Sequence, residues 1–287
     1  MHNERRTYLD IQPDPLPELP VERGPSGRGV GRWVPDEKHR LLADFIEGSW
    51  PARAKFPDRV LIDLFAGPGR IQVEGENFTR NGGSLVAWRQ SQRKPQAAFT
   101  QVLVGDIDPE RVAACHTRLQ TAGAPSIALP GAALDTAARA VAALRNRRSL
   151  CLAYLDPYNL EHLAFDIIRT LAELPKIDFA VHFSTMDFTR NLEMEFDPAR
   201  ARFDAAAPGW RNAIDPAKLS KQALREAVFD YWLHLVQGLG FTFAERMPLV
   251  KNERNHPLYR LVFFSRSPLP NVIWSDVAQA PTRDLFG

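Results

Sequence analysis

The segment LIDLFAGPGR, residues 61–70, constrains the fold more than any other part of the chain. Apolar residues surround Asp63 in a short run, as in a strand that is covered on both faces. Gly67 and Gly69 then end that run abruptly. Glycine adopts backbone angles that other residues avoid, and it lets the backbone approach a ligand closely. The segment therefore predicts a buried strand whose closing turn faces a binding site.

Strand and helix patterns alternate along the rest of the chain. Short apolar runs predict strands over 59–65, 100–108, 149–159 and 177–184, and 241–250 and 259–267 predict two closing strands that end the chain. Apolar residues at helical spacing predict helices over 35–50, 84–92, 109–123, 133–146, 163–176 and 225–240. This alternation predicts an α/β fold with a mostly parallel sheet and crossover helices.

Composition shifts divide the chain. Residues 1–35 are rich in Pro, Gly and Arg and predict an extended arm. Residues 36–287 predict one α/β domain, interrupted at about 187–225 by a charged segment that we interpret as a helical insertion. The sequence does not indicate an oligomeric state.

The overall composition excludes several classes of protein. A net charge of +2 permits nucleic-acid binding without predicting it. Cys115 and Cys151 are far apart and have no metal-ligand spacing, so we expect neither a disulfide framework nor a bound metal. The first residues do not resemble a secretion signal, and no apolar run is long enough to span a membrane. We therefore expect a cytoplasmic protein.

The turn after the first strand disfavours a dinucleotide ligand and does not match a phosphate-binding loop. A dinucleotide site would have a third glycine three residues after Gly69, where this chain has Gln72. No Lys-Ser or Lys-Thr pair follows, so the turn is not a phosphate-binding loop. A tight turn with no ligand remains the alternative.

Acidic residues at two strand ends favour a different ligand. Asp106 closes the second predicted strand, where a carboxylate can accept both hydroxyls of a ribose. Asp63, one strand away, can hold an amine. A nucleoside with a charged amino-acid tail satisfies both acids, and S-adenosylmethionine is such a molecule.

A third strand end carries Asp156, Pro157 and Tyr158. The carboxylate and the proline carbonyl can accept hydrogen bonds from an exocyclic amine, and the tyrosine can stack on a flat ring. This arrangement is typical of enzymes that methylate the amino groups of bases, which usually have two prolines there. The alternative is that Asp156 merely caps the following helix.

Seven blocks of sequence, in order, resemble the three-Cys-motif partner (TcmP) family of bacterial class I methyltransferase-like proteins. They are DEKHRLLADF, LIDLFAGPGR, NGGSLVAW, VGDIDPER, LAYLDPYNL, FSTMDFTRN and YRLVFFSRS, and they span about residues 36 to 275. The resemblance implies a Rossmann-like, seven-stranded, mostly parallel sheet that ends in an antiparallel hairpin. It also implies a three-cysteine partner protein that resembles radical S-adenosylmethionine enzymes.

The resemblance also implies roles for individual residues. The cofactor-binding residues would be Asp63, Phe65, Ala66, Gly67, Gly69, Asp106 and the adjacent Ile107. The catalytic residues would be Lys38, His39, Asp156, Pro157 and Tyr158, and the substrate-binding residues Asn159 and Arg190. We expect Lys251 to bind substrate for a different reason, because it stands in the last loop, near the expected substrate face. One departure is Ala132, which stands where many methyltransferases have an acid for the adenine amine; Asp135 is the alternative acid for that role.

Two functions follow from the sequence. The first is an S-adenosylmethionine-dependent methyltransferase that acts on an amino group of a nucleic-acid base. The second is a binding protein with a methyltransferase fold that serves the three-cysteine partner without catalysis. The intact strand-end acids favour the first, and Ala132 favours the second. We expect His182 to be a core histidine whose hydrogen bonds are satisfied.

Overall fold

Short apolar runs form the strands of the main sheet. The computed structural model describes residues 12–24, 26–184, 203–215, 218–251 and 257–279. The strands of its large sheet are β1 (Asp58–Asp63), β4 (Gln101–Asp106), β5 (Ser126–Pro130), β6 (Ser149–Leu155), β7 (Ile177–Ser184), β8 (Thr242–Phe243), β9 (Leu249–Lys251) and β10 (Pro257–Ser265). All eight residues of β7 are buried, which explains why this strand is apolar along most of its length.

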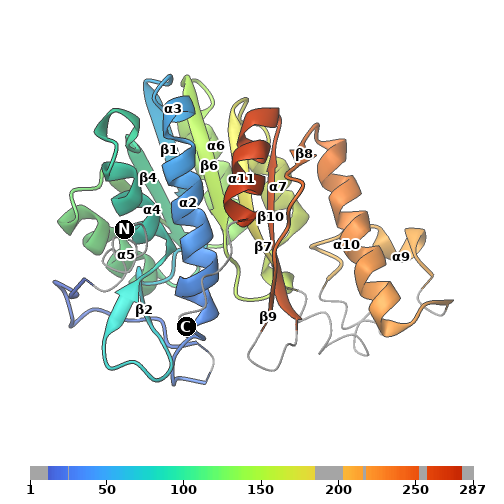
Figure 1. Cartoon of the computed structure of the whole chain (residues 1–287), viewed down its shortest axis with the longest axis horizontal. Helices are drawn as coiled ribbons and strands as arrows, with labels where there is room; N and C mark the ends of the chain where they lie inside the picture. The colour runs from blue at the N-terminus through green and yellow to red at the C-terminus, as the bar shows by residue number, and fades with distance from the viewer. Residues whose placement is uncertain (1–11, 25, 185–202, 216–217, 252–256, 280–287) are drawn as a thin grey trace.

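The strand order is β5-β4-β1-β6-β7-β10-β8, and β9 also pairs with β10 (Figure 1). The pairs from β5 to β7 are parallel, whereas β10 is antiparallel to β7. The prediction of a Rossmann-like, mostly parallel sheet with an antiparallel closing pair is confirmed. The sheet has eight strands in the described part of the chain, one more than the seven expected, because β9 adds to β10 beside the main strand path. Because the strands from β5 to β7 are parallel, their carboxyl ends lie along one edge, here called the carboxyl edge.

Helices cover both faces of this sheet. One face packs against α2 (Arg40–Gly48), α4 (Gly83–Gln92), α5 (Pro109–Thr121) and α11 (Pro268–Gln279). The other face packs against α6 (Ala133–Leu144), α7 (Phe165–Leu171) and α10 (Lys221–Gly238). Short helical segments complete the described chain: α3 (Trp50–Arg53), α9 (Trp210–Ala213), η2 (Pro95–Ala97) and η3 (Leu160–His162). Figure 1 shows α2 and α11 in front of the sheet.

The first predicted helix begins with a π-helical turn, η1 (Val34–His39), which continues into α2. Proline at the start of a helix costs no hydrogen bond, which suits Pro35. Both Lys38 and His39 are buried at the end of this turn. Single π-helical turns are rare and occur frequently at functional sites.

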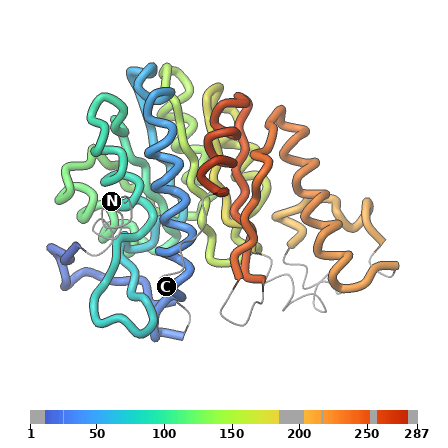
Figure 2. The backbone as a smooth tube through the Cα atoms, viewed as in Figure 1, coloured from blue at the N-terminus to red at the C-terminus, as the bar shows by residue number. Residues whose placement is uncertain are grey.

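The predicted arm lies against the domain. Within the described chain, Glu22 and Val30 form isolated bridges with a hairpin of β2 (Arg70–Gln72) and β3 (Thr79–Asn81). Figure 2 shows the arm running beside this hairpin. The hairpin itself was not predicted and occupies the chain between the glycine turn and α4. The arm's boundary at residue 35 stays a prediction.

The end of the chain differs from the sequence prediction in two ways. The single strand expected over 241–250 is two short strands, β8 and β9, and each pairs with a different part of β10. A helix, α11, follows β10, so the prediction that two strands end the chain is wrong. The expected insertion at 187–225 falls partly outside the described residues; its last five residues begin α10.

Candidate functional site

The three predicted strand-end acids lie along the carboxyl edge on neighbouring strands. Asp63 is the last residue of β1, Asp106 the last of β4, and Asp156 follows β6. β1 lies between β4 and β6. The sheet therefore brings together three residues that are separated by more than forty positions in the sequence.

Asp63 is a buried carboxylate that supports the turn. Its Oδ2 accepts a 2.5 Å hydrogen bond from Ser84 Oγ on α4, and its Oδ1 accepts a 3.1 Å bond from the N–H of Phe65. Burial raises the pKa of Asp63 to about 7, although these two bonds lower it. A carboxyl group with such a pKa is readily ionised by a neighbouring cation.

Gly67 and Gly69 have φ angles of 55° and 81°, which few other residues adopt. The N–H of Gly67 donates to Asp106 Oδ2 at 3.1 Å, so the turn and the second strand end are directly joined. A Cβ atom on Gly69 would lie 3.1 Å from the Cα of Cys115 on α5. Gly69 is therefore required for helix packing, and a valine there would test the fold more than ligand binding.

Asp106 has several donors around it. Its Oδ1 accepts from the N–H of Asp108 at 2.9 Å, and Arg111 Nε lies 3.5 Å from its Oδ2. The next residue, Ile107, is 77% exposed. In the loop between β5 and α6, Ala132 is the N-cap residue of α6 and offers no side chain to cap the helix. Asp135 is exposed in the first turn of α6.

Asp156 is at the centre of a buried polar cluster. Lys38 Nζ lies 2.7 Å from both of its carboxylate oxygens. Tyr154 donates its hydroxyl to Oδ2 at 3.2 Å, and His182 Nδ1 lies 3.1 Å from Oδ1. These partners are all side chains, so Asp156 joins η1 to β6 and β7. The structure shows no capping bond from this carboxylate to the following helix, so the capping alternative is not supported.

In this cluster the negative charge of Asp156 lies against the positive charge of Lys38. Burial by itself would raise the pKa of Asp156, but the Lys38 ammonium and the His182 ring hold it well below its usual range. Burial also raises the pKa of Tyr154, and the nearby carboxylates raise it further. The cluster therefore holds an ionised Asp156 beside a neutral Tyr154.

Two buried histidines flank this cluster. His182 Nδ1 faces Asp156 Oδ1 and the carbonyl of Pro157, the latter at 3.2 Å, and two oxygen acceptors assign the proton to Nδ1. Its Nε2 is buried and has no hydrogen-bond partner among the described residues, so the prediction of a core histidine holds for its burial and its Nδ1 but not for its Nε2. Burial and the Lys38 ammonium lower the pKa of His39 to about 3, and its Nδ1 is buried and equally unpartnered.

The sequence reasoning assigned no site role to Tyr154 and His182. Side chains on a strand alternate between faces, so Tyr154, two residues before Asp156, lies on the same face. This alternation could have predicted from the sequence that Tyr154 lies beside Asp156. The contact from His182 depends on the register between β6 and β7, which the sequence does not show.

Other predicted site residues lie at varied distances from this cluster. Tyr158 is 60% exposed. Asn159 accepts a hydrogen bond from the N–H of His162 and so caps η3. Arg190 lies outside the described residues.

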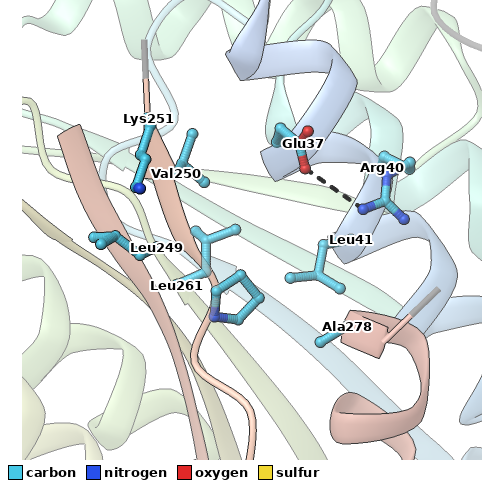
Figure 3. A pocket seen from close by; sticks show the side chains of 9 residues that line it. Glu37, Arg40, Leu41, Leu249, Val250, Lys251, Leu261 and Ala278 are labelled. Carbon is cyan, nitrogen blue, oxygen red and sulfur yellow. Dashed lines mark ion pairs between the residues drawn. The ribbon is translucent and has the colours of Figure 1, made fainter. Parts of the chain in front are cut away.

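Lys251 lies at the end of β9 and lines a pocket of about 450 Å³. Figure 3 shows it across the pocket from Glu37 and Arg40, which form an ion pair at 3.6 Å. Apolar side chains, including Leu41 and Leu261, lie between them. Asp156 does not line this pocket, so the structure does not bring Lys251 to the polar cluster.

The described residues show neither a metal-binding cluster nor a membrane-spanning helix. No group of three or more His, Cys, Asp or Glu side chains in them is arranged to hold a metal ion. Nor is any described helix both long and apolar enough to cross a membrane.

Comparison with known proteins gives similarity in solved structures only. No protein-family model matches the chain, and no curated protein matches it. An O-methyltransferase from Bacillus cereus, solved with S-adenosylhomocysteine, is 8% identical, with coverage of 91% of this chain and 89% of that one and a TM-score of 0.43. The O-methyltransferase TomG from Streptomyces achromogenes, solved with S-adenosylmethionine, is 14% identical, with coverage of 79% and 78% and a TM-score of 0.41.

The protein LPL1258 from Legionella pneumophila is 8% identical, with coverage of 79% of this chain and 84% of that one and a TM-score of 0.46. Identities and scores this low assign neither an activity nor a ligand to the chain, and they do not test the TcmP resemblance. The assignment of fold rests on the strand order. By that order, the chain has a Rossmann-like, mostly parallel sheet with an antiparallel closing strand.

Proposed function

We propose that this protein is an S-adenosylmethionine-dependent methyltransferase. The observation that carries the proposal is that Asp63 and Asp106 each accept a hydrogen bond from a backbone N–H of the same glycine turn, at the carboxyl edge. Open α/β sheets bind their ligands at this edge. A buried carboxyl group and a second acid joined to the turn suit a nucleoside with a cationic tail.

The residues at this edge fit the cofactor. Asp106 would accept the ribose hydroxyls, Asp63 would hold the ammonium of the amino-acid tail, and the exposed Ile107 would contact the flat base. Gly67 would let the backbone approach closely. When bound, S-adenosylmethionine supplies an electrophilic methyl group; the chain binds and orients the two reactants.

For the methyl acceptor, we propose an amino group on a nucleic-acid base. The exposed Tyr158 ring can stack on a base, and the carbonyl of Pro157 can accept an N–H. Both oxygens of Asp156 already contact Lys38, so we assign Asp156 a supporting role: it holds His182 Nδ1 and Lys38 in place. This differs from the sequence-based hypothesis, in which Asp156 contacts the amine directly.

The second candidate is a binding protein with this fold that serves a three-cysteine partner. Two observations favour it: Ala132 provides no acid for an adenine amine, and the Asp156 carboxylate is already neutralised by Lys38. Under this candidate, ligand binding at the turn could persist without methyl transfer.

Calorimetry with S-adenosylhomocysteine tests the shared step. Two charge-assisted hydrogen bonds contribute about 1.5–3 kcal/mol each, so Asp106→Ala should weaken binding by at least about tenfold. Glu173→Ala, which changes an exposed acid between α7 and the amino end of β7, is the matched control and should leave binding unchanged. Absence of binding by the unmutated protein would contradict the proposal.

A labelled-methyl assay over DNA, RNA and candidate partner proteins separates the two functions. Label transferred to a base amino group supports the methyltransferase proposal in full. Label transferred to another acceptor supports methyltransferase activity but contradicts the proposal that the acceptor is a base amino group. Ligand binding without any transfer, together with capture of a three-cysteine protein, favours the second candidate.

A further inference from the structure

The arm carries an acidic side chain to the glycine turn. The N–H of Glu22 donates to the carbonyl of Arg70 at 2.9 Å, and the N–H of Gln72 donates to the carbonyl of Glu22 at 2.8 Å. These backbone bonds fix Glu22 beside the strand that follows the turn. Its Oε1 accepts from the N–H of Gly24 at 2.6 Å, which orients the carboxylate.

Arg111 lies between this carboxylate and Asp106. Its Nη2 contacts Glu22 Oε2 closely, whereas its Nε is 3.5 Å from Asp106 Oδ2. The same Nη2 is 3.1 Å from the position that a Cβ atom on Gly67 would occupy. The guanidinium therefore crosses the turn, and its closer contact is with the arm.

This arrangement matters because Asp106 has limited accepting capacity. Its two oxygens already accept from the N–H groups of Gly67 and Asp108. A guanidinium binds a carboxylate most favourably in a bidentate pair. If Arg111 made such a pair with Asp106, it would occupy the lone pairs that two hydroxyls of a ligand require.

We propose that Glu22 is a positioning residue of the nucleoside site: by holding Arg111, it leaves Asp106 available for the ribose hydroxyls. The inference rests on the proposed binding of S-adenosylmethionine and extends it to the arm. Glu22 does not contact the ligand in this scheme. Its effect on affinity acts entirely through Arg111.

The test is a double-mutant cycle with S-adenosylhomocysteine as the calorimetric probe. Glu22→Gln keeps an acceptor for Gly24 and removes the charge, so Arg111 should move onto Asp106 and binding should weaken about tenfold. Arg111→Ala alone should bind at least as tightly as the unmutated protein. In the Arg111→Ala background, Glu22→Gln should have no effect. Glu74→Gln, which removes another exposed ion pair with the arm, is the control and should change nothing.

Several results would overturn the proposal. Unchanged affinity in a folded Glu22→Gln protein is one, and equal weakening with and without Arg111 is another. If Glu22→Gln fails to fold, Arg111→Ala decides: weaker binding contradicts the scheme, because a competitor would have been removed. Failure of the unmutated protein to bind the probe contradicts the proposed function itself, and with it this inference.

Discussion

If Asp63 holds the ammonium of the ligand, as proposed, its raised pKa couples ligand binding to pH. Its pKa of about 7 means that the free protein holds a proton there in mildly acidic solution. A bound ammonium favours the carboxylate, so binding must release that proton. We expect the affinity for S-adenosylhomocysteine to rise with pH between about 5.5 and 7, by up to about tenfold per unit, and then to level off.

Calorimetry in two buffers with different heats of ionisation measures this release directly. Up to one proton should leave per ligand bound below pH 7, and Asp63→Asn should abolish both the release and the pH dependence. The ligand's own α-amino group, with an ordinary pKa of about 7.7–8.0, stays charged in this window. If binding did not depend on pH, the proposal that Asp63 holds the ammonium of the ligand would be contradicted.

The buried pair of Lys38 and Asp156 predicts a large loss on single substitution. Removing one partner leaves an uncompensated buried charge, which typically costs about 3–5 kcal/mol. We expect Lys38→Met to lower the free energy of unfolding by that amount in urea titrations. Adding Asp156→Asn should recover much of the loss, because neither charge then remains.

The exposed Lys55→Met is the control for this pair and should stay within about 0.5 kcal/mol of the unmutated protein. A single Lys38→Met variant of unchanged stability would show that the pair contributes little. His182 offers a second measurement, since burial lowers its pKa, Asp156 raises it and the Lys38 ammonium lowers it further. Its pKa, followed by NMR, should rise in Lys38→Met.

At the scale of elements, buried guanidinium groups hold the arm, and Arg118 makes most of these contacts. Arg118 on α5 donates to Asp14 Oδ2 at 2.7 Å and to the carbonyls of Pro20 and Pro68, also at 2.7 Å each. Pro68 belongs to the glycine turn, so one side chain ties the arm and the turn together. Asp14 is also 3.8 Å from Arg70, another buried cation.

Asp14→Asn should therefore release the arm and loosen the turn. Hydrogen exchange should show faster exchange at the N–H groups of Glu22 and Gln72, whereas the amides of β6 and β7 should stay protected. Arg28→Ala, which loses only a largely exposed ion pair of the same arm, is the matched control. Equal exchange in both variants would show that Asp14 does not anchor the arm.

Elements with a strong hydrophobic pattern were predictable from the sequence. The strand over 177–184 was predicted with its observed bounds, because its residues are buried on both faces. The β2–β3 hairpin was missed because its strands are three residues long and mostly polar. Helix α11 was missed because prolines stand at its first and third positions, a pattern that resembles a loop.

The candidate site was partly predictable for a related reason. Strand-end acids can be read from a sequence, because an apolar run marks where the strand ends. The pairing of Lys38 with Asp156 depends on how η1 lies over the sheet, and the contact of Arg111 with Glu22 depends on the path of the arm. Neither contact follows from the periodicity of the sequence, so neither could be predicted without knowing how these segments fold.

At the scale of the whole molecule, Asp178 predicts how stability depends on pH. It lies near the start of β7, away from the carboxyl edge, and hydrogen-bonds with Ser265. Burial raises its pKa from an ordinary 3.8 to about 6, which the Ser265 bond only partly offsets. Between these values the folded state binds more protons than the unfolded state, so this contribution to stability falls as pH rises.

The variant Asp178→Asn removes that dependence. A shift of about two pKa units corresponds to roughly 3 kcal/mol at most, so the variant should be more stable than the unmutated protein at pH 8 by about 1–3 kcal/mol, and little changed at pH 4. Urea unfolding at the two pH values measures this difference. Asp178 lies near the amino end of β7, away from the carboxyl edge where the ligand is proposed to bind. Affinity for S-adenosylhomocysteine should therefore be unaltered. Equal stability of the two proteins at pH 8 would show that the Asp178 carboxylate is not destabilising in the folded state.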